Sequence, residues 1–171
     1  MQNGQIGFGR QETTEMADDN LPGGFSLRPE SMLCFDIYAT HHAIGQTYQP
    51  LLAELGLTYP QYLVMIVLWE RDGQSVGELG TRLDLASSTL TPLIKRMESQ
   101  GLLARKRDTS DERRVRVTLT RAGRELEQRA SHVPGCVAKA FGLSVEEFVQ
   151  LHEMLGKLRA SLKSVREAEV A

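Results

Sequence analysis

Apolar residues recur at helical spacing through most of the chain. The first series begins at Leu33 and stops near Gly56, and its members repeat every three to four residues, as on one face of a helix. Residues 62–69 are nearly all apolar, which predicts a second helix that is buried around most of its circumference. The apolar stripe over 145–162 predicts a long final helix.

Capping residues mark where the predicted helices begin. Ser75 and Glu78 form a capping-box pattern, which opens a short helix that ends at about Leu83. Ser87 or Ser88 is expected to cap the next helix, which runs to Gln100. Similar signals precede three further helices, at Thr58, Thr120 and Ser144, with a break near Pro134.

Two short β-prone runs follow the paired helices. Residues 102–107 form the first, and residues 115–119 form the second, in which apolar and polar positions alternate. A polar turn over 108–113 joins them, so we expect a β-hairpin with a charged tip. The predicted fold class is therefore mainly α with a small β-hairpin.

Composition fits one globular domain with a tail. The chain has 171 residues, of which 41% are hydrophobic. Residues 1–27 are rich in glycine without a sustained period, so we expect a flexible tail before a single domain over 28–171. No apolar run has the length of a membrane span, no secretory signal is evident, and two cysteines make no disulfide framework. We expect a cytoplasmic protein with no contact to a membrane.

Charge is distributed unevenly along the chain. The formal net charge is −2, but ten of the 20 Lys and Arg residues lie between Lys95 and Arg124. Only four acidic residues share that segment, so its net charge is +6 and the remainder of the chain carries −8. A basic segment in an acidic protein is typical of a surface that meets a polyanion, although a solvated surface would look similar.

The order helix, turn, helix and basic hairpin predicts binding to double-stranded DNA. The second helix of such a pair lies in the major groove, and a hairpin arginine can enter the adjacent minor groove. Arg113 is best placed for the minor groove, with Asp111 two residues before it to orient the guanidinium. The candidate DNA-binding residues are Ser87, Ser88, Thr89, Thr91, Lys95, Arg96, Arg107, Asp111, Arg113 and Arg114.

These segments resemble the MarR family of bacterial repressors. The resemblance rests on residues 79–96, on residues 101–105 and on Asp111-Glu-Arg-Arg-Val-Arg-Val-Thr-Leu-Thr120. It implies a winged helix–turn–helix with terminal dimerisation helices. On this interpretation residues 58–120 form the DNA-binding lobe, and residues 28–57 and 121–171 pair the subunits of a homodimer.

A second group of residues could sense an oxidant. Tyr38 is four residues after Cys34 and shares its helix face, and His41 falls near that face too. A tyrosine hydroxyl can donate a hydrogen bond to a thiolate, the form of cysteine that attacks peroxides. A buried cysteine can equally serve as a small packing residue. No third ligand accompanies Cys34 and His41, so no metal site is expected.

The same region resembles the organic hydroperoxide resistance regulators, a branch of that family. The matching segments are Leu33-Cys-Phe-x-x-Tyr38, residues 48–52 and residues 57–65. The resemblance implies that Cys34 is oxidised by an organic hydroperoxide among Tyr38, Tyr48 and Tyr59, and that DNA is then released. In two-cysteine members a second thiol resolves the oxidised cysteine. Cys136 is the candidate here, but it aligns about one helical turn early, which leaves a low-molecular-weight thiol as the alternative.

Two other functions remain open on the sequence alone. A reversible aromatic or hydrophobic ligand could release a repressor of this kind, with Cys34 as a structural residue. A cysteine peroxidase would need a positive group to activate the thiolate, yet no Arg or Lys lies between Leu33 and Glu70. We therefore expect a DNA-binding repressor and not an enzyme, with neither cofactor nor metal.

Overall fold

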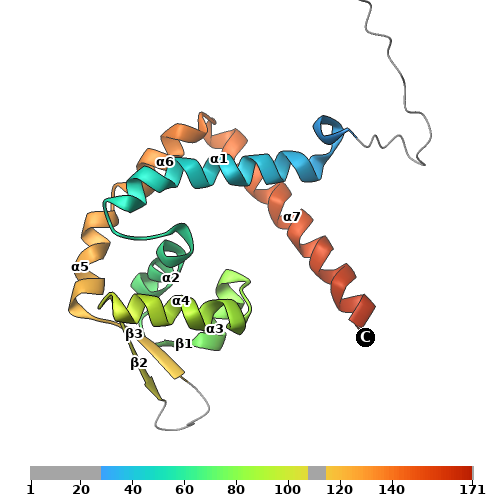
Figure 1. The fold of residues 1–171 in the computed structure, drawn as a ribbon. Coiled ribbons are helices and arrows are strands. Elements are labelled where there is room, and N and C mark those ends of the chain that lie inside the picture. Colours follow the sequence, from blue (N-terminus) through green and yellow to red (C-terminus); the bar gives the residue numbers. More distant parts are fainter. Residues whose placement is uncertain (1–27, 108–114, 171) are drawn as a thin grey trace, which may run out of the picture. The chain divides into compact units, whose positions relative to one another are not determined.

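The structure is a computed structural model that describes residues 28–107 and 115–170 (Figure 1). The chain divides into two compact units, Met1–His42 and Ala43–Ala171. The elements in chain order are η1 (Pro29–Ser31), α1 (Leu33–Ala53), α2 (Tyr59–Glu70), β1 (Gln74–Ser75), α3 (Val76–Leu83), α4 (Ser87–Ser99), β2 (Leu103–Arg107), β3 (Val115–Leu119), α5 (Arg121–Ala130), α6 (Val133–Phe141) and α7 (Val145–Val170).

Capping interactions close the predicted helix starts. The Thr58 N–H donates to Gln61 Oε1 at 2.8 Å before α2. Ser75 and Glu78 form the predicted capping box of α3, in which the Ser75 N–H donates to a Glu78 carboxylate oxygen at 2.7 Å. These contacts satisfy N–H groups that have no partner within the helix.

One predicted cap is wrong. Helix α4 already includes Ser87 and Ser88, and Ala86 holds the capping position with an extended backbone and no side-chain hydrogen bond. The Ala86 carbonyl oxygen instead accepts the first helical hydrogen bonds, from Thr89 and Leu90. Both serine hydroxyls are therefore carried on the first turn of α4.

The sheet contains the predicted hairpin and one further strand. Strands β2 and β3 pair antiparallel from Leu103 opposite Leu119 to Arg107 opposite Val115. Strand β1 adds two residues to the other edge of β3, so the order is β1-β3-β2. The hairpin β2–β3 is the wing of the protein, and β1 joins its base to the start of α3.

The core lies within the second unit, where α2, α4, the sheet and α5 meet. The largest side chains that are fully buried come mainly from α2 and α4 and from the strands. They are Leu52, Val64, Met65, Leu68, Leu79, Leu90, Ile94, Met97, Leu103, Val117 and Val133. Because the buried residues of α4 belong to this core, the helix is held firmly and its opposite face is free to meet a partner.

Helix α7 presents apolar side chains at its surface. The predicted stripe is helical throughout, and the break near Pro134 is where α6 begins, with the proline in its first turn. The exposed large apolar side chains of α7 are Val145, Phe148, Val149, Leu151, Met154, Leu155, Leu162 and Val165. Within residues 28–107 and 115–170, no helix has the length and hydropathy needed to span a membrane.

Candidate functional site

Helices α3 and α4 form the predicted helix–turn–helix. Asp84 ends α3 in the left-handed conformation, with φ of 53°, and turns the chain toward α4. A Cβ atom on Gly80 would stand 2.8 Å from the Leu85 carbonyl oxygen, so glycine permits the close approach at this turn. The turn therefore sets the angle at which α4 is presented.

Helix α4 has one face in the core and one face in solvent. Leu90, Leu93, Ile94 and Met97 are buried, at the spacing of a single helix face. Every predicted DNA-contact residue of this helix is exposed, namely Ser87, Ser88, Thr89, Thr91, Lys95 and Arg96. Hydroxyl and cationic side chains on one exposed face can reach both base edges and phosphates.

The wing is joined to the end of α4 by an ion pair. The Arg105 guanidinium meets Glu98 Oε2 at 2.7 Å, and the Arg105 backbone N–H donates to Glu98 Oε1 at 3.1 Å. The side-chain hydrogen bond, and after it the backbone one, lowers the pKa of Glu98. Arg107 is exposed at the end of β2. Three predicted contacts lie outside the described residues, namely Asp111, Arg113 and Arg114.

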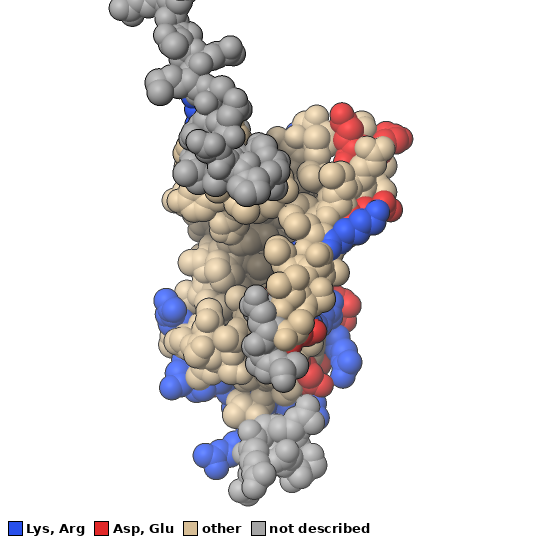
Figure 2. All heavy atoms as spheres, turned by 90° about the vertical axis from the view of Figure 1, so that its right-hand side faces the viewer, with Lys and Arg blue, Asp and Glu red and all other residues tan. Residues whose placement is uncertain are grey.

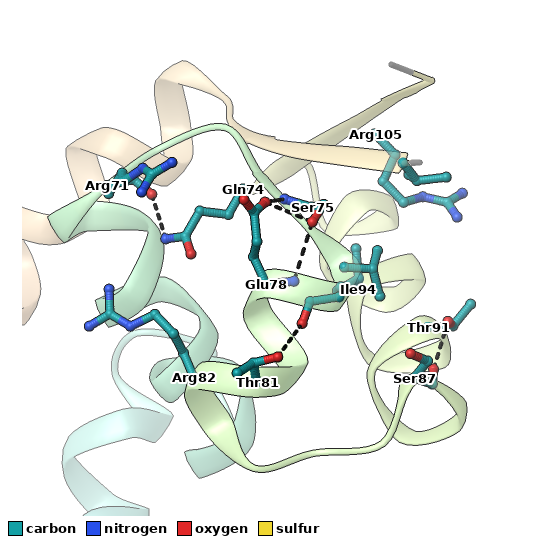
Figure 3. Close-up of a pocket in the computed structure, with 13 residues that line it drawn as sticks. Arg71, Gln74, Ser75, Glu78, Thr81, Arg82, Ser87, Thr91, Ile94 and Arg105 are labelled. Carbon is teal, nitrogen blue, oxygen red and sulfur yellow. Dashed lines mark hydrogen bonds between the residues drawn. The ribbon is translucent and has the colours of Figure 1, made fainter. Parts of the chain in front are cut away.

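A cavity of about 860 Å³ lies between α3, α4 and the wing (Figure 3). Ser87 and Thr91 line it from α4, and the Thr91 hydroxyl donates to the Ser87 carbonyl oxygen at 2.7 Å. Figure 3 places Arg71 and Arg82 on one side of this cavity and Arg105 on the other. The cavity thus combines the exposed face of α4 with cationic side chains from both flanks.

Sequence reasoning missed two of these cations. Arg71 and Arg82 precede the basic segment that begins at Lys95, and only the tertiary fold brings them beside α4. Arg82 pairs with Glu70 at 2.6 Å, and this hydrogen bond, together with the positive charge, lowers the pKa of Glu70. Figure 2 shows Lys and Arg side chains gathered around the lower end of the view, where the wing lies.

Cys34 occupies the first turn of α1 in the first unit. It is the second residue of the helix, and its side chain is exposed. The N–H groups of Phe35 and Asp36 donate to the Met32 carbonyl oxygen at 2.9 and 3.2 Å, which closes this turn. One turn further on, the Tyr38 ring meets the His42 ring edge-on, with centroids 4.7 Å apart. Cys34 and Tyr38 are therefore one helical turn apart, as predicted.

Three tyrosines cluster in the second unit. The Tyr48 ring lies 4.6 Å from that of Tyr59 and 6.0 Å from that of Tyr62, between centroids. Burial raises the pKa of Tyr48, and so would negative charge on either neighbour. Burial likewise raises the pKa of Tyr59 and of Tyr62. All three phenols therefore keep their protons at neutral pH and can donate hydrogen bonds.

The second thiol lies on α6. Cys136 is exposed, and its backbone N–H donates to the His132 carbonyl oxygen at 3.1 Å in the first turn of that helix. Cys34 and Cys136 are both free thiols. Among the described residues, no three His, Cys, Asp or Glu side chains are arranged to hold a metal ion.

Comparison with known proteins establishes the family. The family described as transcriptional regulator SarA/Rot matches residues 46–129. The organic hydroperoxide resistance transcriptional regulator of Bacillus subtilis is 42% identical over 136 residues, which cover 80% of this chain and 92% of that protein. The chain belongs to the MarR family, in its organic hydroperoxide resistance branch. The regulator TtmR of Methylorubrum extorquens is 47% identical over 133 residues, 78% of this chain and 68% of that one.

The MarR-family winged helix of this chain matches a solved relative. Reduced AbfR bound to DNA, a protein of Staphylococcus epidermidis, aligns with a TM-score of 0.68 and 34% identity, over 78% of this chain and 91% of that chain. AbfR has also been solved in an overoxidized form bound to DNA and in a disulfide form. The predicted family and fold class are confirmed.

Proposed function

We propose that this MarR-family regulator is a homodimeric repressor that binds operator DNA and releases it when an organic hydroperoxide oxidises Cys34. The observation that carries the proposal is that the Cys34 thiol is exposed in the first turn of α1. The same chain has a winged helix in which α4 exposes a polar face. The name of the Bacillus subtilis relative and the oxidation states in which AbfR has been solved support the same chemistry.

DNA binding follows from the arrangement of α4 and the wing. Helix α4 enters the major groove with the hydroxyls of its first turn nearest the bases, while Lys95 and Arg96 follow further along. The wing carries Lys106 and Arg107 beside it, both exposed. Cations on α4 and on the wing beside it favour contacts with the phosphate backbone of a duplex.

The cavity between α3, α4 and the wing suits the DNA backbone. Phosphates at its rim would meet the guanidinium groups of Arg71 and Arg82 on one flank and that of Arg105 on the other. Arg82 and Arg105 already pair with carboxylates, so phosphate would compete with Glu70 and Glu98 for them. We assign these arginines to positioning the duplex and not to reading its sequence.

The oxidation step needs only Cys34 and the peroxide. The thiolate sulfur attacks the terminal peroxide oxygen and the O–O bond breaks, which oxidises the sulfur to a sulfenic acid. The alkoxide that leaves takes up the proton that the thiol gave up on ionisation, and departs as an alcohol. The first turn of α1 stabilises negative charge on that sulfur because helix N-termini carry partial positive charge. Tyr38 lies one turn away, and Tyr48 and Tyr59 are protonated phenols that can donate hydrogen bonds in the assembled dimer.

A second copy of the chain would cover the apolar helix surfaces. Leu33, Phe35 and Ile37 of α1 are exposed, as is the apolar stripe of α7. Exposed apolar side chains gathered along one helix are typical of an interaction surface. Pairing through the terminal helices also places two α4 helices on one duplex, as a palindromic operator requires.

The test is a DNA-binding titration on the fragment upstream of the protein's own gene. Reduced protein is compared with protein treated with cumene hydroperoxide, and Cys34→Ser is run beside the wild type. We expect treatment to weaken wild-type binding about 100-fold, equivalent to roughly 2.7 kcal/mol, and to leave Cys34→Ser unchanged. The loss of binding should be reversed by reduction.

Two results would overturn this proposal in different ways. Failure of the reduced protein to bind the fragment with any preference over unrelated DNA would reject the repressor assignment. Tight binding that hydroperoxide does not alter would reject Cys34 as a sensor and direct the search to a reversible ligand.

A further inference from the structure

Asp72 and Arg124 connect three elements of the winged helix. Asp72 lies in the turn between α2 and β1, and Arg124 lies in the first turn of α5. Arg124 Nη1 donates to Asp72 Oδ2 at 2.7 Å. Asp72 Oδ1 accepts hydrogen bonds from the backbone N–H groups of Gly73 at 2.8 Å and Leu119 at 2.9 Å. The carboxylate thus bonds with its own turn, with the end of β3 and with α5.

The end of β3 is held from both of its backbone polar groups. Besides the Leu119 N–H that reaches Asp72, the Leu119 carbonyl oxygen accepts from Arg124 Nη2 at 3.1 Å. Asp72, Leu119 and Arg124 therefore form a closed ring of hydrogen bonds. We call Asp72 and Arg124 the clasp.

The register of the sheet explains the place of Asp72. Strand β1 begins at Gln74, which pairs with Val117, and ends at Ser75, which pairs with Arg116. If the strand began two residues earlier, the same antiparallel register would put Asp72 opposite Leu119. The Asp72 carboxylate therefore accepts the Leu119 N–H, which a backbone carbonyl oxygen of a longer β1 would otherwise have accepted. Strand β3 is thus hydrogen-bonded as far as the base of the wing.

A second contact joins α2 to α5 beside the clasp. The Trp69 indole N–H donates to the Gly123 carbonyl oxygen at 2.9 Å. A Cβ atom on Gly123 would overlap the Leu102 carbonyl oxygen, so α5 also lies directly against the chain that enters β2. Both ends of the wing are consequently held against the start of α5.

We propose that the clasp positions the wing for DNA, so that Asp72 and Arg124 set operator affinity without either touching the duplex. This inference rests on the proposed DNA-binding function. Only Thr120 separates β3 from α5, so a shift of α5 against α2 has to break the clasp or carry the wing with it. The wing cations Lys106 and Arg107 can reach phosphates together with α4 only while the wing keeps its angle.

Removal of the Asp72 charge distinguishes positioning of the wing from a direct effect of that charge on DNA. Asp72 is an anion on the lobe that meets a polyanion, so charge alone predicts that Asp72→Asn tightens DNA binding. The clasp predicts the reverse, because the Arg124 pairing is lost while the protein becomes more positive. The sign of the change in affinity therefore distinguishes the two explanations.

The experiment measures operator affinity of the reduced full-length chain for Asp72→Asn, Arg124→Gln and Arg124→Lys. Arg121→Gln is the matched control, because Arg121 is on the same helix and pairs with Glu125 of its own helix, at 2.7 Å, through an exposed contact. We expect Asp72→Asn and Arg124→Gln to weaken DNA binding by roughly tenfold or more. Arg124→Lys should weaken it by less, and Arg121→Gln should have the smallest effect of the four variants.

Two further readouts distinguish positioning from general destabilisation. Trp69 is the only tryptophan of the sequence, so its emission reports the α2–α5 contact directly. We expect the emission to move to longer wavelength in the Asp72→Asn and Arg124→Gln variants at temperatures well below their unfolding transitions, and not in Arg121→Gln. In a double-mutant cycle, Arg107→Ala should cost less affinity in the Asp72→Asn background than in the wild type.

The outcomes of these measurements are distinct. Tighter DNA binding by Asp72→Asn, or additive effects of Arg107→Ala and Asp72→Asn, would overturn the clasp while leaving the proposed repressor intact. Absence of operator binding by the wild type would instead reject the proposed function on which the clasp rests. A variant that unfolds is replaced by Arg124→Lys, which keeps the charge and tests the same ring of contacts.

Discussion

The phenol rings of Tyr48 and Tyr59 lie 4.6 Å apart between centroids, with their planes inclined by 47°. Tyr62 completes the group from the first turns of α2, where it is buried. Aromatic rings at this distance stabilise each other. The three phenol hydroxyl groups can donate hydrogen bonds only while they are protonated, and they lose their protons at high pH.

Alkaline pH should destabilise the protein through this cluster. The folded pKa values of Tyr48, Tyr59 and Tyr62 are raised above 10.0, chiefly by burial, so the folded state retains protons that the unfolded state loses. The stabilisation is complete below pH 10 and is lost as the pH rises through the folded values. Urea unfolding across this range, together with tyrosinate absorbance, measures both effects. Titration of all four tyrosines near pH 10 would contradict the prediction.

A methyl group at Gly123 should destabilise the fold. Gly123→Ala brings a Cβ atom into the Leu102 carbonyl oxygen, and this backbone atom has little room to move aside. We expect a loss of roughly 1–3 kcal/mol in the free energy of unfolding. Gly77→Ala is the control, because nothing lies within 4 Å of its added Cβ atom. Equal melting temperatures for the two variants would show that the contact at Gly123 is not tight.

The cations around the cavity and on the wing should contribute to the salt dependence of DNA binding. Arg71→Ala and Arg107→Ala each remove one expected phosphate contact, so each should lower the slope of log affinity against log salt by about 1. Arg159→Ala on α7 removes the same charge at a distance from the winged helix in sequence and should leave the slope unchanged. A slope that falls equally in all three variants would indicate a response to net charge alone.

Substitution of Cys136 should leave the first step of the response intact. Formation of a sulfenic acid on Cys34 needs no second thiol, so Cys136→Ser should still release DNA when hydroperoxide is added. Electrophoresis without reductant, together with mass spectrometry, then identifies the later oxidation product of the wild type. A disulfide-linked dimer that both Cys34→Ser and Cys136→Ser abolish indicates Cys136 as the resolving thiol, and a mass adduct on Cys34 indicates a small thiol. Loss of release in Cys136→Ser would contradict the expected order of steps.

The helices and the hairpin could be predicted because their signals are local. The capping box at Ser75 and Glu78 and the alternation over 115–119 depend on residues that are neighbours in sequence. Strand β1 could not be found in this way, because two residues become a strand only when β3 lies beside them. The predicted serine cap is wrong because the Ala86 carbonyl oxygen already accepts the first helical hydrogen bonds, which places both serines inside the helix.

The candidate site was predictable only where one element carries it. The exposed residues of α4 follow from the period of its buried apolar residues, whereas Arg71 and Arg82 reach the same cavity from the end of α2 and from α3 through tertiary packing. The clasp is hidden for the same reason, since Asp72 and Arg124 are far apart in sequence. The roles of Cys34, Tyr48 and Tyr59 stay predictions, because they concern an assembly of two chains.

The uncovered apolar surface of α7 makes protein concentration a variable of this system. If a second chain buries that surface, folding and association are one equilibrium, and the melting temperature should rise as the protein is concentrated. Dilution then acts as a perturbation in its own right. At protein concentrations below the dimer dissociation constant, a DNA titration would report assembly of the subunits instead of their affinity for the operator. If an oxidant weakens the dimer, its measured effect on DNA binding would be largest in the most dilute samples.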